Sequence, residues 1–307
     1  MNRLDTAILR TVLYADVFSF PLTVEEIHFF LIHDHPVSVI EIRSALATSA
    51  ALTGLLCQDR GFIALRGREA AITERERREM ATRRLWPLAE RYGRWLARLP
   101  YVRMVAITGA LAMRNAATHD DDLDFFLLTA AGRVWLARAC AIVLVRLARL
   151  RGVTLCPNYI AAETALEQDH QTLFIAHEVA QMIPVYGLDL YAALRAANPW
   201  VAAHLPNASG HFHSAKTAVH GRLWRTLKQL AETALNNRLG DALEDWEHRR
   251  KRSRFAPQTH QPLSAARIDE QQVKGHFNDY GHHVLTAYGT RLRAYGLDDV
   301  VLPATGD

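Results

Sequence analysis

Two neighbouring stretches of the chain decide its fold: Val105-Ala-Ile-Thr-Gly-Ala-Leu-Ala-Met-Arg-Asn115 and Asp120-Asp-Asp-Leu-Asp-Phe-Phe-Leu-Leu-Thr129. In the first, a short apolar strand ends at Thr108-Gly109 and a helix begins. In the second, an apolar strand begins beside Asp122 and Asp124, and residues two apart in a strand point to the same face. The two stretches therefore predict a glycine turn next to a strand that presents a pair of carboxylates on one side.

The apolar pattern around these stretches predicts an α/β domain over residues 100–207. Short apolar runs indicate strands, and longer amphipathic runs indicate helices. We expect strands at 102–107, 123–129 and 156–161, and helices at 133–150, 171–182 and 188–197.

Residues 1–66 have the pattern of a winged helix-turn-helix domain. Capping boxes at Thr23–Glu26 and Ser38–Glu41 start two helices after a first amphipathic helix, and Asp59-Arg-Gly61 indicates a hairpin turn. A DNA reader needs several cations, but the expected recognition helix, 39–50, holds one arginine and the domain has a net charge of −2. We therefore expect a structural or partner-docking role rather than duplex DNA binding.

Two further parts complete the expected organisation. Residues 67–99 form a connecting helix whose Glu and Arg residues lie four apart, as in Glu74–Arg78, Glu79–Arg83 and Glu90–Arg94. Residues 208–307 form an all-helical C-terminal domain, with helices over 214–250 and 267–295. A basic run at 249–254 is either a solvated helix end or a surface for RNA or acidic partners.

Composition indicates a soluble cytoplasmic protein with no membrane partner. Half of the 307 residues are hydrophobic and 22% are charged, which suits a sizeable buried core. No apolar stretch approaches the roughly 20 residues that a bilayer-spanning helix needs. The N-terminus carries Asp5 and Arg10 within its apolar pattern, unlike a signal peptide, and three scattered cysteines make no disulfide framework.

The glycine turn and the acidic strand together indicate a site for phosphate and metal. Backbone amides of Gly109 and Ala110, at the start of a helix, can bind phosphate oxygens. Asp122 and Asp124 provide the oxygen ligands that Mg²⁺ or Mn²⁺ prefers. The acidic cluster alone can equally be a solvated loop, and the glycine an ordinary turn, so the interpretation depends on their combination.

A glycine turn followed by an Asp-x-Asp strand resembles the motif of the nucleotidyltransferase superfamily. This superfamily includes DNA polymerase β, poly(A) polymerase and the aminoglycoside nucleotidyltransferases. Its signature is a hydrophobic residue, Gly and Gly or Ser, a short spacer, and Asp-x-Asp or Asp-x-Glu. The segments 20–26, 109–115 and 180–187 look like an uncharacterised prokaryotic group of nucleotidyltransferase-domain proteins. The resemblance implies an α+β fold with a small mixed sheet, preceded by the winged helix-turn-helix and followed by the helical domain.

The resemblance also implies roles for single residues. Asp122 and Asp124 would be the catalytic pair that holds Mg²⁺ or Mn²⁺. The nucleoside triphosphate would be bound by residues of the turn, the following helix and a later strand: Thr108, Gly109, Ala110, Arg114 and Asn158. Arg114 either reaches the γ-phosphate or is an ordinary surface arginine.

Two residues depart from the family pattern. Ala110 stands where the family has Ser or Gly, so a phosphate-binding hydroxyl is missing. Asn158 stands at the third carboxylate position, and an amide can coordinate a metal but cannot accept a proton from a hydroxyl. Glu163 is nearby, but its odd offset from Asn158 directs it to the opposite sheet face unless a bulge intervenes.

The leading functional expectation is an enzyme that transfers a nucleotidyl group from a metal-bound nucleoside triphosphate to an acceptor hydroxyl, with RNA or protein among the candidate acceptors. One alternative is a catalytically impaired nucleotide-binding regulator or adaptor, which Asn158 favours. Another is a winged-helix DNA-binding regulator. The pair His177-Glu178 has no third ligand at metal spacing, so we interpret it as surface or packed residues.

Overall fold

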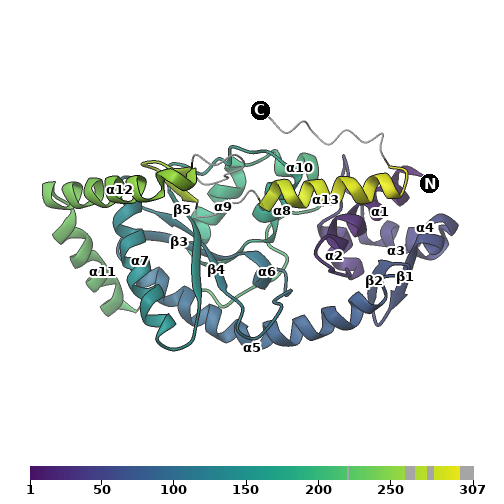
Figure 1. The fold of residues 1–307 in the computed structure, drawn as a ribbon, viewed down its shortest axis with the longest axis horizontal. Helices are drawn as coiled ribbons and strands as arrows, with labels where there is room; N and C mark the ends of the chain where they lie inside the picture. The colour runs from purple at the N-terminus through teal and green to yellow at the C-terminus, as the bar shows by residue number, and fades with distance from the viewer. Residues whose placement is uncertain (220, 260–266, 275–279, 298–307) are drawn as a thin grey trace.

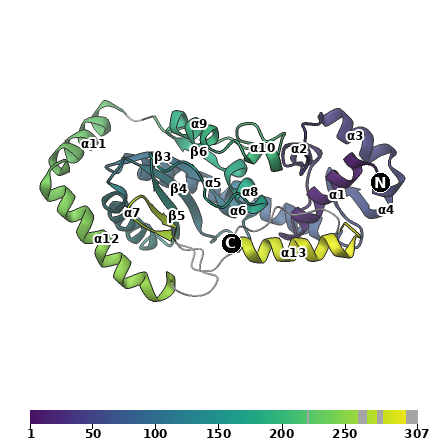
Figure 2. The same cartoon turned by 90° about the horizontal axis from the view of Figure 1, so that it is seen from above.

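The computed structural model describes residues 1–219, 221–259, 267–274 and 280–297. They form an α+β fold in which a mixed sheet lies between an N-terminal helical module and an arm of two helices (Figures 1 and 2). The long helix α5, Ala70–Arg98, passes beneath both the module and the sheet (Figure 1). In the described ranges, no helix combines the length and the apolar character needed to cross a membrane.

The N-terminal module contains the expected helices and hairpin, with one more short helix. Its elements are α1 Arg3–Asp16, α2 Val24–Phe29, α3 Val39–Thr48, α4 Ala50–Leu55, β1 Leu56–Asp59 and β2 Phe62–Leu65. Both predicted capping boxes are present, at Thr23 and at Ser38. The hairpin turns through Arg60 and Gly61, whose φ angles of 50° and 83° suit a tight two-residue turn.

The hydrophobic core of the module continues into the rest of the chain. One hydrophobic cluster joins α1 and α2 to three later helices, α8 Leu173–Gln181, α10 Val201–His204 and α13 Tyr280–Ala294. Arg75 of α5 adds a buried ion pair with Glu26 of α2, at 2.8 Å. These contacts fix the module against the sheet-bearing part of the molecule.

Helix α5 has two of the three expected ion pairs. Arg78 bonds Glu74 at 2.8 Å and Arg83 bonds Glu79 at 3.1 Å. Glu90 differs, because it is buried and accepts hydrogen bonds from Trp86 Nε1 at 3.2 Å and from the Lys216 amide at 3.0 Å. It therefore anchors the segment before the helical arm instead of lying on a solvated face.

The central sheet has the order β6-β3-β4-β5-β8-β7. Its strands are β3 Val102–Ile107, β4 Leu123–Thr129, β5 Leu155–Ala162, β6 Ile183–Tyr186, β7 Arg267–Ile268 and β8 Gln272–Lys274. Strands β4 and β5 are parallel and are connected by α7, Val134–Arg149, whereas the other pairs are antiparallel. The three strands expected from the sequence are thus neighbours at the centre of the sheet, and β6 was not expected.

Alternate residues of β4 pack on opposite faces of the sheet. Leu123, Phe125 and Leu127 join the core formed with α5 and α7. Phe126 and Leu128 join a smaller core with α9, Leu188–Ala197. By this alternation Asp122 and Asp124 belong to the second face, at the edge where β4 begins.

The prediction of an all-helical tail is wrong over residues 267–274. Helices α11, Arg222–Leu235, and α12, Arg238–Thr259, form the arm seen in Figure 2, but the expected helix over 267–295 is replaced by β7, β8 and then α13. The Asp269 carboxylate accepts the amides of Gln271 and Gln272, each at 2.8 Å, which stabilises a turn instead of a helix. The tail therefore extends the central sheet through the pairing of β8 with β5.

Candidate functional site

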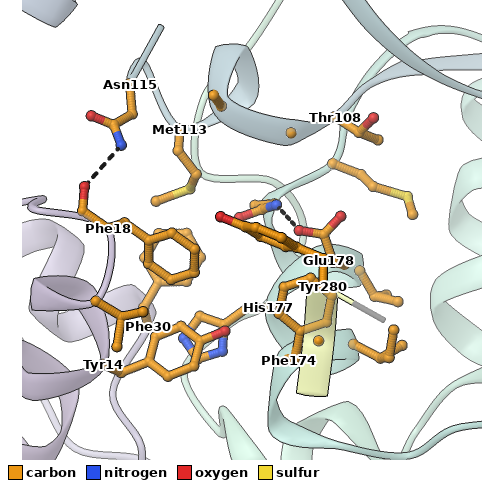
Figure 3. Close-up of a pocket in the computed structure, with 18 of the residues that line it drawn as sticks. Tyr14, Phe18, Phe30, Thr108, Met113, Asn115, Phe174, His177, Glu178 and Tyr280 are labelled. Atoms are coloured by element: carbon orange, nitrogen blue, oxygen red, sulfur yellow. Dashed lines mark hydrogen bonds between the residues drawn. The ribbon is translucent and has the colours of Figure 1, made fainter. Parts of the chain in front are cut away.

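A cavity of about 1160 Å³ lies where the N-terminal module, the sheet edge, α8 and α13 meet (Figure 3). In Figure 3, Tyr14, Phe18 and Phe30 of the module lie on one side, Thr108 lies on the other, and Glu178 lies between them. Five of the predicted site residues line this cavity: Thr108, Gly109, Ala110, Asp124 and Asn158. The residues of the sequence motif therefore line one large cavity and do not lie on a flat surface.

The glycine turn lies directly against the acidic strand. Gly109 has a φ of +64°, and a Cβ at this position would lie 3.1 Å from Cγ of Asp124 and still closer to Oδ2. The Thr108 amide donates to the Asp124 carbonyl at 3.1 Å, which holds the end of β3 to the start of β4. Glycine is required here both for the left-handed backbone and for the close approach of the carboxylate.

Asp124 and Asp122 have different environments. Burial, together with the negative charges of Asp122 and Asp121, raises the pKa of Asp124 to about 7, against a hydrogen bond from the Cys156 thiol that lowers it. Asp122, two residues earlier on the same face, is exposed and does not line the cavity. The pair thus presents one carboxylate to the cavity and one to solvent, and a cation between them would offset both the burial and the repulsion.

Asn158 reaches the site through an irregularity in β5. Phe125 pairs with Pro157 and Phe126 with Tyr159, so Asn158 is the extra residue of a bulge, which redirects its side chain. Its Nδ2 donates to Thr108 Oγ1 at 3.5 Å. Asn158 is therefore beside the glycine turn, at the place where a third carboxylate was sought.

Glu163 and Arg114 lie elsewhere. The amide of Glu163 donates to Thr129 at the far end of β4, so the structure does not bring this carboxylate to Asp124. Arg114 has a φ of 54°, forms an ion pair with Glu79 at 3.6 Å and does not line the cavity. The expected γ-phosphate contact of Arg114 has no support in this geometry.

Glu178 is the site residue that sequence reasoning missed. Its pKa rises to about 7, first because of burial and then because of the charge of Asp124, whereas Lys274 and a hydrogen bond from Gln181 lower it. Glu178 and Lys274 both line the cavity with Asp124. A signal was available, because Glu178 is the one acidic residue in the largely apolar segment Leu173–Gln181.

The other end of the cavity is aromatic. His177 stacks on Tyr14 with ring centroids 4.0 Å apart and on Phe30 at 5.8 Å. His177 Nδ1 contacts the Leu173 carbonyl at 3.0 Å, and burial lowers the pKa of His177 to about 4, so the ring is neutral at pH 7. Of the two alternatives left by the sequence, a surface or a packed histidine, His177 is the packed one.

A separate cluster joins His33, Asp34 and His35, whose potential ligand atoms lie within 4.8 Å of one another. It is the only such group of metal-ligating side chains among the residues that the structure describes. The cluster follows α2, does not line the cavity, and lies within electrostatic range of the Arg10 cation. The cluster therefore lies apart from the candidate site.

No protein-family profile, curated protein or solved structure matches this chain. The resemblance to nucleotidyltransferases therefore rests on the residues described above.

Proposed function

We propose that the protein is a metal-dependent nucleotidyltransferase that moves a nucleoside monophosphate group from a nucleoside triphosphate to an acceptor hydroxyl. The observation that carries the proposal is the packing of Gly109 against the Asp124 carboxylate beside a cavity of about 1160 Å³. The cavity has room for a nucleotide and an acceptor together, because sites for one small molecule are typically about 300 to 1000 Å³.

The donor set fits a hard divalent cation. Asp122 and Asp124 offer carboxylate oxygens and Asn158 offers an amide carbonyl, and Mg²⁺ commonly uses one or two carboxylates and completes its shell with water and phosphate oxygens. Mn²⁺ suits the same oxygen ligands. When bound, such an ion neutralises the triphosphate charge and orients the reacting groups.

The residues of the turn have a binding role in this proposal. Thr108, Gly109 and Ala110 line the cavity, and their polar groups would contact the phosphate oxygens. Helix α6, Gly109–Ala112, is only four residues long, so its dipole adds little. Asn158 holds the Thr108 side chain through its hydrogen bond and thereby positions it.

Glu178 is the candidate proton acceptor. In the transfer, the acceptor oxygen forms a bond to the α-phosphorus, the bond from that phosphorus to the bridging oxygen breaks, and pyrophosphate leaves. The acceptor proton must go to a base, and Asn158 cannot take it. Glu178 lines the same cavity, and its pKa of about 7 suits proton transfer near neutral pH.

The test of the metal site uses Asp124→Asn and Asp122→Asn in the full chain. We expect each to abolish magnesium-dependent ATP binding in calorimetry, and transfer from α-phosphate-labelled nucleotides to cellular fractions to fall at least ~100-fold. Asp120→Asn is the matched control, because Asp120 is a neighbouring exposed acid that does not line the cavity. Unchanged ATP affinity in both site variants would refute the metal-site assignment.

The role of Glu178 has its own test. Glu178→Gln should lower kcat by about 10² to 10⁴ and leave the affinity for magnesium-ATP nearly unchanged, because a general base acts in the transfer step. A normal kcat in this variant would show that the proton goes elsewhere.

A second candidate function is a nucleotide-binding regulator without transfer activity, and the amide at Asn158 favours it. In that case ATP binding would depend on Asp124, but no labelled nucleotide would be transferred to an acceptor in any cellular fraction. The DNA-binding alternative loses support, since Arg43, the cation of α3, forms an ion pair with Glu25 of α2.

A further inference from the structure

The arm of α11 and α12 exposes apolar side chains on both of its helices. In each helix they recur at positions i, i+4 and i+7, and each residue is between 37% and 69% exposed. The six residues are Leu223, Leu227, Leu230, Leu239, Leu243 and Trp246. We call them the apolar arm face, because residues at this spacing lie on one side of a helix.

The apolar residues of the two helices lie along the same edge of the arm. Lys228, which donates to a carbonyl of α5 at 3.0 Å, directly follows Leu227. Glu244, which accepts two backbone amides of α7, directly follows Leu243. One residue is about 100° of helix rotation, so in both helices the apolar residues are turned in the same sense away from the packed side. Because α11 and α12 follow one another in one direction around the sheet (Figure 2), this places both sets on one edge.

The turn between the helices holds them at one angle. A Cβ at Gly240 would lie 2.8 Å from the carbonyl carbon of Leu235 and still closer to its oxygen, so this close approach requires glycine. Asn237 Oδ1 accepts the amides of Leu239 at 2.9 Å and Gly240 at 3.2 Å, which satisfies the start of α12. The two helices therefore present their apolar residues as one surface.

The apolar arm face is symmetric about this turn. Leu227 and Leu243 are equally far along the chain from Leu235, and the two outer pairs are centred within one residue of the same point. The three pairs are Leu223 with Trp246, Leu227 with Leu243, and Leu230 with Leu239. A two-fold axis through this point reverses the direction of the arm, so each residue would lie opposite its counterpart in a second copy.

The size of the face suits such a contact. The six residues expose roughly 700 Å², close to the ~800 Å² that each partner contributes to a standard protein interface. Contiguous apolar patches of this size are uncommon on monomeric proteins and usually mark interaction sites. The area and the symmetry together favour a second copy of this chain as the occupant.

We propose that the apolar arm face joins two copies of this chain in an antiparallel two-fold dimer. Leu227 of each copy packs against the partner's Leu243, and the outer pairs pack in the same way. None of the six residues lines the cavity, so the proposal does not rest on the proposed function.

The first test is the mass of the full chain by analytical ultracentrifugation. Wild type should be a dimer at micromolar concentration. Leu227→Glu should raise the dimer Kd at least ~100-fold, because the dimer would bury two unpaired carboxylates. The monomer should keep its far-UV circular dichroism, since Leu227 is exposed. Leu147→Glu is the matched control: Leu147 of α7 is 50% exposed and lies outside the arm, so the dimer should persist.

A mixing experiment tests the pairing. Leu227→Glu chains and Leu243→Lys chains should each be monomeric alone and should form a dimer when mixed, because the introduced carboxylate then faces the introduced ammonium. Mixing Leu227→Glu with Leu223→Lys should leave both monomeric, since Leu223 faces the partner's Trp246.

Four results would overturn the proposal. They are a monomeric wild type, a dimer that persists in Leu227→Glu, a dimer that only Leu147→Glu dissociates, and a failure of the Leu227→Glu and Leu243→Lys mixture to associate. A monomeric wild type is also tested with vesicles of phosphatidylcholine and phosphatidylglycerol. Binding that Leu227→Glu abolishes would assign the face to a membrane surface instead of a second copy.

Discussion

The two ends of the cavity are built from the chain in different ways. The polar end takes Asp124 and Asn158 from β4 and β5, and Thr108 and Gly109 from the turn that follows β3. These three strands are consecutive in the sequence and adjacent in the sheet. The aromatic end takes residues as far apart as Tyr14 and Tyr280. A site on adjacent strands depends on local pairing, whereas the aromatic end forms only when the N-terminal module and α13 have docked.

The two ends also carry different energetic costs. At the polar end, burial raises the pKa of both Asp124 and Glu178, so ionisation of these carboxylates is unfavourable without a cation. At the aromatic end, the cost is the buried Tyr14 hydroxyl, which has no hydrogen-bond partner among the described residues. Variants that act on one end alone therefore test the two ends separately.

The largest expected effect comes from the ion pair that fixes the module. Arg75 and Glu26 are each 3% exposed at their side chains, so Arg75→Met leaves a buried carboxylate without its cation and should lower the free energy of unfolding by about 3 to 5 kcal/mol. Urea unfolding measures the loss. Arg43→Ala, which breaks the exposed pair with Glu25, should cost less than about 1 kcal/mol. Equal losses would mean that the module is not held by its buried contacts.

The next effect concerns the polar end. Gly109→Ala should lower transfer activity roughly 100-fold, because the new Cβ must displace the Asp124 carboxylate and small displacements of reacting groups have effects of this size. Gly132→Ala is the control, since Gly132 has a φ of +67° but no atom within 4 Å of its added Cβ. It should cost only the backbone strain of about 1 kcal/mol. Equal activity in both variants would separate Gly109 from the reaction.

A pH profile tests the aromatic end. The pKa of His177 is about 4 in the folded protein and about 6.5 when unfolded, so the unfolded chain binds the proton first as the pH falls. His177 should therefore remove about 2 kcal/mol of stability between pH 7 and pH 5.

His177→Phe, which preserves a ring between Tyr14 and Phe30, should lose less stability than wild type over this range in urea unfolding. The other groups that face His177 are the Leu173 carbonyl and His204. The control is a substitution of His119, whose side chain is 65% exposed. It should leave the pH dependence of stability as it is in wild type. If His177→Phe lost as much stability as wild type between pH 7 and pH 5, the His177 ring of the wild-type protein would not be desolvated.

The smallest expected effect is at Arg114. Because it pairs with Glu79 at a partly exposed position and does not line the cavity, Arg114→Ala should change the affinity for magnesium-ATP less than about twofold and stability by less than about 1 kcal/mol. Calorimetry decides the first and urea unfolding the second. A tenfold loss of affinity would restore the γ-phosphate contact inferred from the sequence.

Much of the fold followed from signals that act over a few residues. The capping boxes at Thr23 and Ser38 and the turn at Arg60-Gly61 form as expected, because their hydrogen bonds and dihedral angles are local. The strand β8 was missed, since a three-residue strand has no pattern of its own and is stabilised by pairing with β5. The bulge at Asn158 likewise arises from the register between two strands.

The sequence by itself determined one part of the polar end, the contact between the glycine turn and the acidic strand. A glycine turn followed by Asp-x-Asp on an apolar strand places Gly109 beside Asp124 through the pairing of neighbouring segments. Tertiary structure decided the rest: that Glu178 lies in the same cavity, that Arg114 does not, and that Tyr14 and His177 stack at the aromatic end. The physical reason is that hydrophobic burial is non-directional, so the pattern of α1 and α8 predicts that they pack but not against which partner.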